Sequence, residues 1–157
     1  MERAREASPA ALAEWLSGGE WHRARHLERL NDHLLDLATG RIRRLLVSMP
    51  PRHGKSELIS HWLPVWYLHT WPERRIILAT YGAEFAADWG RRCRNTVQEH
   101  ADILRVRIAQ DSAAANRWHT TAGGGMVAAG AGGPLTGRGA DMLIVDDPIK
   151  TAEDAYS

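Results

Sequence analysis

The first regular pattern along the chain is a run of leucines at three- and four-residue steps, between residues 21 and 39. These steps place the apolar side chains on one face of a helix with 3.6 residues per turn. The leucines are Leu27, Leu30, Leu34 and Leu37. Gly40 follows the run, and a glycine just after a periodic apolar segment commonly ends a helix. The pattern therefore predicts a helix over this range with one buried face.

Three short, continuous apolar runs predict strands. They are residues 45–49, 75–80 and 142–145. Runs without polar alternation are typical of parallel sheets that are covered on both faces. Helix-compatible segments follow the first two runs, at residues 57–63 and 84–100, so that strand and helix alternate. This alternation predicts an α/β domain.

Proline and glycine refine this outline. Pro64 must kink or end the helix that begins near residue 57, because proline has no backbone N–H and its ring crowds the preceding turn. Residues 117–121 and 125–129 predict two short strands, which the glycines between them could join as a hairpin. We expect residues 1–20 to be a flexible lead-in and residues 21–157 to form the domain.

Composition narrows the class of protein. The chain has 157 residues, of which 44% are hydrophobic and 25% charged, as in a soluble globular protein. This length suits one domain with one sizeable core. No apolar run approaches the length that crosses a membrane, and the single cysteine, Cys93, cannot form an internal disulfide. The formal net charge of +1 does not by itself indicate a nucleic-acid partner.

The first apolar run leads into a turn that ends in Gly54-Lys55-Ser56, which is the pattern of a phosphate-binding loop. In such a loop backbone N–H groups and the start of the next helix surround a phosphate. Lys55 would supply a positive charge for the phosphates, and the Ser56 hydroxyl would bind Mg²⁺. The usual motif has glycine where this chain has Met49. The residues expected to contact the nucleotide are Pro51, Arg52, His53, Gly54, Lys55, Ser56 and Glu57.

The last apolar run ends in two carboxylates, Asp146 and Asp147, which is the Walker B pattern. In open α/β sheets, ligands bind at the carboxyl ends of the strands. Asp146 would hold Mg²⁺, directly or through water, and Asp147 would orient or deprotonate the attacking water. The two motifs together predict a domain that binds ATP and Mg²⁺.

In these motifs the sequence resembles the N-terminal ATPase part of a tailed-phage terminase large subunit, the motor that drives DNA into a capsid. The resemblance covers about residues 21–154, and residues 46–57, 77–81, 135–141 and 143–150 carry it. It implies a P-loop NTPase fold of the ASCE or RecA-like kind, with a mainly parallel sheet flanked by helices. We expect this fold to be incomplete at its C-terminus, because terminases continue with a coupling motif and a nuclease domain. No nuclease activity is therefore expected from this chain.

The resemblance also assigns roles to individual residues. Arg52 corresponds to the arginine characteristic of terminase phosphate loops, and we count it with Asp147 among the catalytic residues. Arg138, in the loop before the Walker B strand, corresponds to an arginine finger that reaches the nucleotide of a neighbouring subunit; the alternative is a surface loop residue. His26 falls where terminases place residues that approach the adenine, although a packed helix histidine is an equal alternative.

The partners follow from the same resemblance: double-stranded DNA, a terminase small subunit, a portal protein and, in the full-length protein, a homo-oligomeric ring. It implies a bacterial host cytoplasm and no membrane partner. Two other hypotheses stay open. The chain could be an inactive prophage remnant that binds nucleotide without turnover, or it could be another P-loop DNA motor of the helicase kind.

Overall fold

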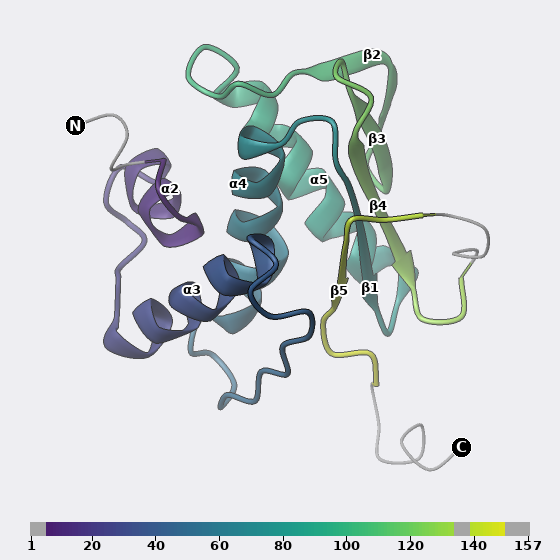
Figure 1. The fold of residues 1–157 in the computed structure, drawn as a ribbon. Coiled ribbons are helices and arrows are strands. Elements are labelled where there is room, and N and C mark those ends of the chain that lie inside the picture. Colours follow the sequence, from purple (N-terminus) through teal and green to yellow (C-terminus); the bar gives the residue numbers. More distant parts are fainter. Residues whose placement is uncertain (1–5, 134–138, 150–157) are drawn as a thin grey trace. The chain divides into compact units, whose positions relative to one another are not determined.

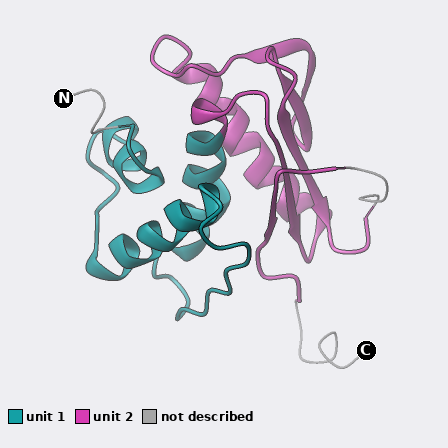
Figure 2. Ribbon diagram, in the orientation of Figure 1, with its two compact units in different colours: residues 1–67 teal, residues 68–157 magenta. Residues whose placement is uncertain are grey.

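The computed structural model describes residues 6–133 and 139–149 (Figure 1). The chain divides into two compact units, residues 1–67 and residues 68–157 (Figure 2). The described elements of unit 1 are α2 (Pro9–Leu16), α3 (Arg25–Ala38), the π-helix η1 (Glu57–Trp62) and the beginning of α4 (Leu63–Thr70). Those of unit 2 are the end of α4, β1 (Arg75–Thr80), α5 (Ala83–Glu99), β2 (Ile108–Ala114), β3 (Arg117–Thr120), β4 (Gly125–Gly130) and β5 (Met142–Val145).

Helix α2 is a packed element of unit 1, which differs from the flexible lead-in that we expected over residues 1–20. The Ser8 hydroxyl caps it by accepting a hydrogen bond from the Ala11 N–H, and Pro9 opens its first turn. Leu12 is fully buried. The Asn31 side chain of α3 accepts a hydrogen bond of 2.9 Å from the Ala10 N–H. The cap and this contact fix a segment that is too short to show a clear period in sequence.

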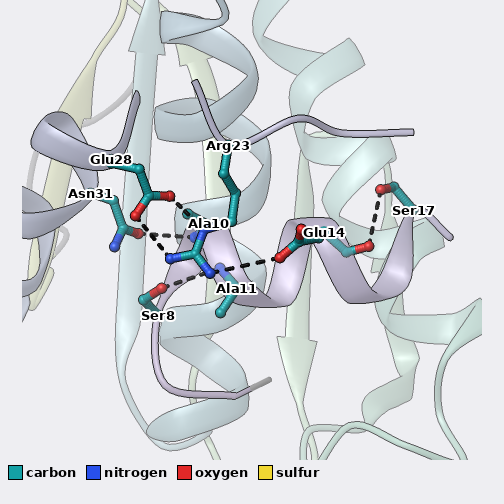
Figure 3. A network of polar contacts seen from close by, with 8 residues as sticks. All are labelled: Ser8, Ala10, Ala11, Glu14, Ser17, Arg23, Glu28 and Asn31. Atoms are coloured by element: carbon teal, nitrogen blue, oxygen red, sulfur yellow. Dashed lines mark hydrogen bonds and ion pairs between the residues drawn. The ribbon is translucent and has the colours of Figure 1, made fainter. Parts of the chain in front are cut away.

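A polar network joins α2 and α3 through Arg23 (Figure 3). The Arg23 guanidinium donates to the Glu28 carboxylate, with one N–O distance of 2.9 Å, and lies 3.6 Å from Glu14. The hydrogen bond to Glu28 is the main reason that the pKa of Arg23 is raised. The same bond lowers the pKa of the Glu28 carboxyl, against the opposing effect of its partial burial. This network ties the segment before α3 to both helices.

Replacing Glu28 by glutamine is expected to remove a small, acid-sensitive part of the stability of unit 1. The pKa of the Glu28 carboxyl is lower in the folded state than its ordinary value of 4.5. The ion pair therefore stabilises the fold at pH values above 4.5, and this contribution is lost as the pH falls through the folded-state pKa. Both side chains are more than one third exposed, so the effect should stay below about 1 kcal/mol. Thermal unfolding should show a larger gap between E28Q and the wild type at about pH 7 than at about pH 3. An equal gap at both pH values would contradict this.

The predicted amphipathic helix over residues 21–39 is confirmed as α3. Leu27, Leu30 and Leu34 are buried on its inner face. The helix ends at Ala38, and Gly40 then adopts a φ of +79°, a left-handed conformation that glycine reaches without steric cost.

The predicted strand over residues 45–49 is wrong for the described chain. These residues form no strand, and Leu46 is 96% exposed. A strand exists only through hydrogen bonds to a neighbouring strand, and the described residues of unit 1 contain no other strand that could supply them. An apolar run therefore indicates the tendency to pair but not the presence of a partner.

The helix predicted from residue 57 is present and continues through Pro64 into α4. Its first part, η1, is wound as a π-helix, in which the Leu63 N–H donates to the Leu58 carbonyl five residues earlier. A regular α-helix would press the Pro64 ring against the Ser60 carbonyl, and a wider turn relieves that contact. The local widening explains why proline neither ends nor breaks this helix.

Unit 2 is built on a five-stranded sheet with the order β2-β3-β4-β1-β5. Strand β1 pairs in parallel with β4 and β5, whereas β3 pairs antiparallel with both β2 and β4. The expectation of a mainly parallel sheet is therefore corrected to a mixed one. The reason is local, because the short turns that join β2, β3 and β4 force the chain to reverse. The predicted hairpin of residues 117–129 is confirmed, and β2 was not predicted.

The core of unit 2 lies between this sheet and α5, which follows one of its faces (Figure 1). The strand register places four buried side chains in one row across the sheet. They are Trp118, Met126, Ile76 and Met142. The Trp118 indole Nε1 donates a hydrogen bond of 3.1 Å to the Gly90 carbonyl of α5. Helix α5 confirms the helix predicted over residues 84–100.

Replacing Gly90 by alanine is expected to destabilise unit 2, although alanine is the better helix former. Alanine gains about 1 kcal/mol over glycine in a helix interior. A Cβ at Gly90, however, would lie 2.3 Å from the Ala115 carbonyl oxygen, and a crowded core costs about 1–3 kcal/mol. We expect a net loss of about 1–2 kcal/mol in urea unfolding. Gly139→Ala is the control, because a Cβ there meets no atom within 4 Å; equal stability of the two variants would contradict the clash.

None of the helices among the described residues combines the length and the apolar composition that a membrane crossing requires.

Candidate functional site

The predicted phosphate loop is a turn over residues 51–54 that leads directly into a helix at Lys55. Two of its residues have left-handed backbone angles, with φ of +61° at Arg52 and +82° at Gly54. The first helical hydrogen bond, 3.0 Å, runs from the Leu58 N–H to the Gly54 carbonyl. Residues 51–54 are therefore a tight turn with two left-handed residues, and the turn ends where the helix begins.

Helix α3 supports the loop from one side. The ring nitrogen Nε2 of His26 lies 2.9 Å from the His53 carbonyl oxygen. Because a carbonyl oxygen only accepts, Nε2 carries the hydrogen. The neighbouring Leu27 packs on Gly54, where an added Cβ would lie 3.2 Å from Leu27 Cδ1. The structure therefore places His26 against the loop backbone, and its predicted approach to the adenine stays a prediction.

The loop also bonds to itself. The His53 ring nitrogen Nδ1 lies 2.7 Å from the Pro51 carbonyl oxygen and donates to it. The rings of His53 and His26 meet edge to face, with centroids 5.8 Å apart. Sequence reasoning included both histidines in the site but missed their mutual arrangement and the role of Leu27. Only the three-dimensional packing of α3 reveals these contacts, because no pattern in sequence links residues 26 and 27 to the loop.

Lys55, Ser56 and Glu57 occupy the first turn after the loop and are half-buried. The Glu57 carboxylate accepts a hydrogen bond of 2.8 Å from Nδ1 of His61, one turn later on the same helix. Helix starts carry positive potential from their N–H groups, and a lysine in this turn adds a full charge to it. This end of the helix is therefore suited to an anion.

The acidic residues lie at the carboxyl end of β5 in unit 2. Asp146 is 4% exposed, and its N–H donates to the Ala79 carbonyl of β1 over 2.9 Å. Asp147 is exposed and has a φ of +43°, and its carbonyl accepts a hydrogen bond of 3.2 Å from the Tyr81 N–H. The ladder between β1 and β5 thus extends past the strand ends and fixes the backbone of both aspartates. The two acids follow a strand as predicted, but that strand is not buried on both faces as expected, because Leu143 is 62% and Val145 is 55% exposed.

The predicted site residues therefore form two groups within the described chain. The loop residues with His26 form one group in unit 1, and Asp146 with Asp147 forms the other in unit 2. Arg138 lies outside the described residues. A common site for the two groups, and the pairing of Ser56 with Asp146 on one Mg²⁺, stay predictions. The described residues contain no cluster of three or more histidine, cysteine, aspartate or glutamate side chains suited to a metal.

A comparison with known protein families gives one match to these residues. Residues 46–157, which include the loop and both aspartates, match the family described as the N-terminal part of the terminase large subunit of the T4likevirus type. Neither the curated proteins nor the solved structures gave a significant match. The matched range begins at Leu46, so it includes the whole predicted phosphate loop but not α3.

Proposed function

The chain belongs to the terminase large-subunit family, in its N-terminal region, and we propose that it binds and hydrolyses ATP to drive phage DNA into a capsid. The family supplies the general role in phage DNA packaging. The observation that carries the ATPase proposal is the turn of residues 51–54. This turn ends at Gly54, and a helix begins at the next residue, Lys55. A phosphate loop needs this sequence of turn, glycine and helix start.

The residues present fit a nucleotide phosphate. Gly54 has a φ of +82° and faces Leu27 at contact distance, so a larger residue there would be strained and crowded. Lys55 follows at the positive end of the helix, where it would neutralise charge on the β- and γ-phosphates. Arg52 would add a second cation from the turn itself. The other predicted contacts are the backbone or side chains of Pro51, His53, Ser56 and Glu57.

The metal proposal rests on the type of oxygen atoms available. Mg²⁺ prefers hydroxyl and carboxylate oxygens, which Ser56 and Asp146 offer. When bound, the ion would neutralise charge on the phosphates. Asp147, with its backbone held by Tyr81, would orient the attacking water. Arg138 of a neighbouring copy would stabilise charge on the transferring phosphoryl group, which a guanidinium fork does well.

The proposed partners are those of a packaging motor: double-stranded DNA, a small subunit and a portal protein. We also propose that copies of the full-length protein form a ring, in which Arg138 of one copy serves the next, and that the motor works in the cytoplasm of the bacterial host. These partners follow from the family and not from a surface of the described residues.

Calorimetric titration of the 157-residue chain with ATP tests the proposal. We expect saturable binding with a dissociation constant between about 1 μM and 1 mM, stronger with Mg²⁺ than with EDTA. Release of inorganic phosphate from the same samples, compared with a D147A variant, tests turnover. Binding that is absent both with and without Mg²⁺ would contradict the proposal, and binding without phosphate release would favour the inactive remnant.

A further inference from the structure

We propose that His26 and His53 are positioning residues that turn two N–H groups of the loop toward the bound phosphate. This inference rests on the proposed function, because it assigns a task within the same nucleotide site. Its starting observation is that both histidine rings bond to carbonyl oxygens of the loop, His26 to that of His53 and His53 to that of Pro51.

Peptide geometry converts these two bonds into an orientation of N–H groups. The described peptide bonds are trans, and in a trans peptide the C=O and the following N–H point in opposite directions. The His53 carbonyl points at His26 on α3, so the Gly54 N–H points away from α3. The Pro51 carbonyl points at the His53 ring, so the Arg52 N–H points away from that ring. The two bonds thus set the direction of two donors.

These donors matter more here than in a loop without prolines. Pro50 and Pro51 have no N–H, so the first part of the loop offers a phosphate no backbone donor. Arg52 and Gly54 are also the two residues of the loop with positive φ. A peptide plane in a turn can rotate, and a rotation here would present a carbonyl oxygen to the phosphate instead of an N–H. The two histidine bonds oppose that rotation.

The arrangement can be altered without disturbing the core. His26 and His53 are both exposed, whereas Leu27, the neighbour of His26 in the chain, is buried. Glutamine can replace the donor of His26, because its side-chain amide carries an N–H at a similar reach. Alanine at either position removes the donor altogether. His33, an exposed histidine two turns further along α3, offers a matched control.

The test compares H26A, H26Q, H53A and H33A with the wild type by calorimetric titration with Mg²⁺-ATP and with inorganic pyrophosphate. One hydrogen bond of ordinary strength corresponds to about a 2- to 12-fold change in affinity. We expect H26A and H53A to weaken both ligands about fivefold, H26Q to stay within about twofold, and H33A to match the wild type. Circular dichroism without ligand should show each variant fully folded at the temperature of the titration, so that unfolding does not account for the loss.

Two results would overturn the inference. If H26A and H53A bind both ligands as the wild type does, the histidines do not position the loop. If H26A weakens ATP but not pyrophosphate, His26 contacts the base and not the phosphate loop. In both cases the wild type still binds ATP, so the proposed function survives; failure of the wild type itself to bind would instead count against that function.

Discussion

Replacing Lys55 by alanine is expected to weaken the binding of Mg²⁺-ATP about 10- to 150-fold. The ammonium group at the start of this helix would bond to phosphate oxygens, and a hydrogen bond to a charged group contributes about 1.5–3 kcal/mol. The positive end of the helix keeps part of the attraction, so some residual binding is expected. Fluorescence titration with a labelled ATP analogue measures the difference, and phosphate release should fall with it.

A control with the same change in net charge separates a local effect from a general one. Arg41 is exposed on a turn of unit 1 and forms an ion pair of 3.1 Å with Asp36. Its replacement by alanine also removes one positive charge, but at a site that has no proposed contact with the nucleotide. R41A should bind ATP within about twofold of the wild type, because exposed charges are screened by salt. Equal losses in K55A and R41A would mean that Lys55 acts through net charge and not through the loop.

The loop illustrates what could be predicted from the sequence and what could not. Gly54-Lys55-Ser56 after an apolar run predicts the turn and the helix that follows, and both are present. The support from His26 and Leu27 could not be predicted, because these residues lie 27 positions before the atoms that they contact. Local sequence patterns indicate the backbone conformation that a segment prefers. They do not record which distant side chain holds it in place.

The sheet shows the same division. The apolar runs at residues 75–80 and 142–145 form β1 and β5, because each pairs with a neighbouring strand of the sheet. The run at residues 45–49 is also mostly apolar, but it forms no strand in the described chain. Strand β2 was not predicted, because its residues do not alternate between buried and exposed. Its register with β3 also shifts partway along the strand. Pairing, and not composition, decides which extended segments become strands.

Replacing Trp118 by alanine is expected to cost unit 2 about 3–5 kcal/mol, the largest effect on stability that we expect. The side chain is fully buried at the start of a row that crosses four strands, so its loss leaves a cavity beside Met126. It also removes the hydrogen bond that joins the sheet to the Gly90 carbonyl of α5. A small domain has a total stability of only about 5–15 kcal/mol. Urea unfolding followed by circular dichroism should therefore show a large fall in the midpoint.

Comparison with Trp118→Phe separates packing from hydrogen bonding at this contact. Phenylalanine keeps much of the ring volume but has no N–H, so only the bond to Gly90 is lost in full. That bond is expected to contribute about 1 kcal/mol. The cost is small because the Gly90 carbonyl lies inside α5 and still accepts a hydrogen bond within the helix when the indole is absent. W118F should thus lose about 1–2 kcal/mol and W118A about three times as much. Equal losses would mean that the hydrogen bond, and not the buried ring, holds α5 to the sheet.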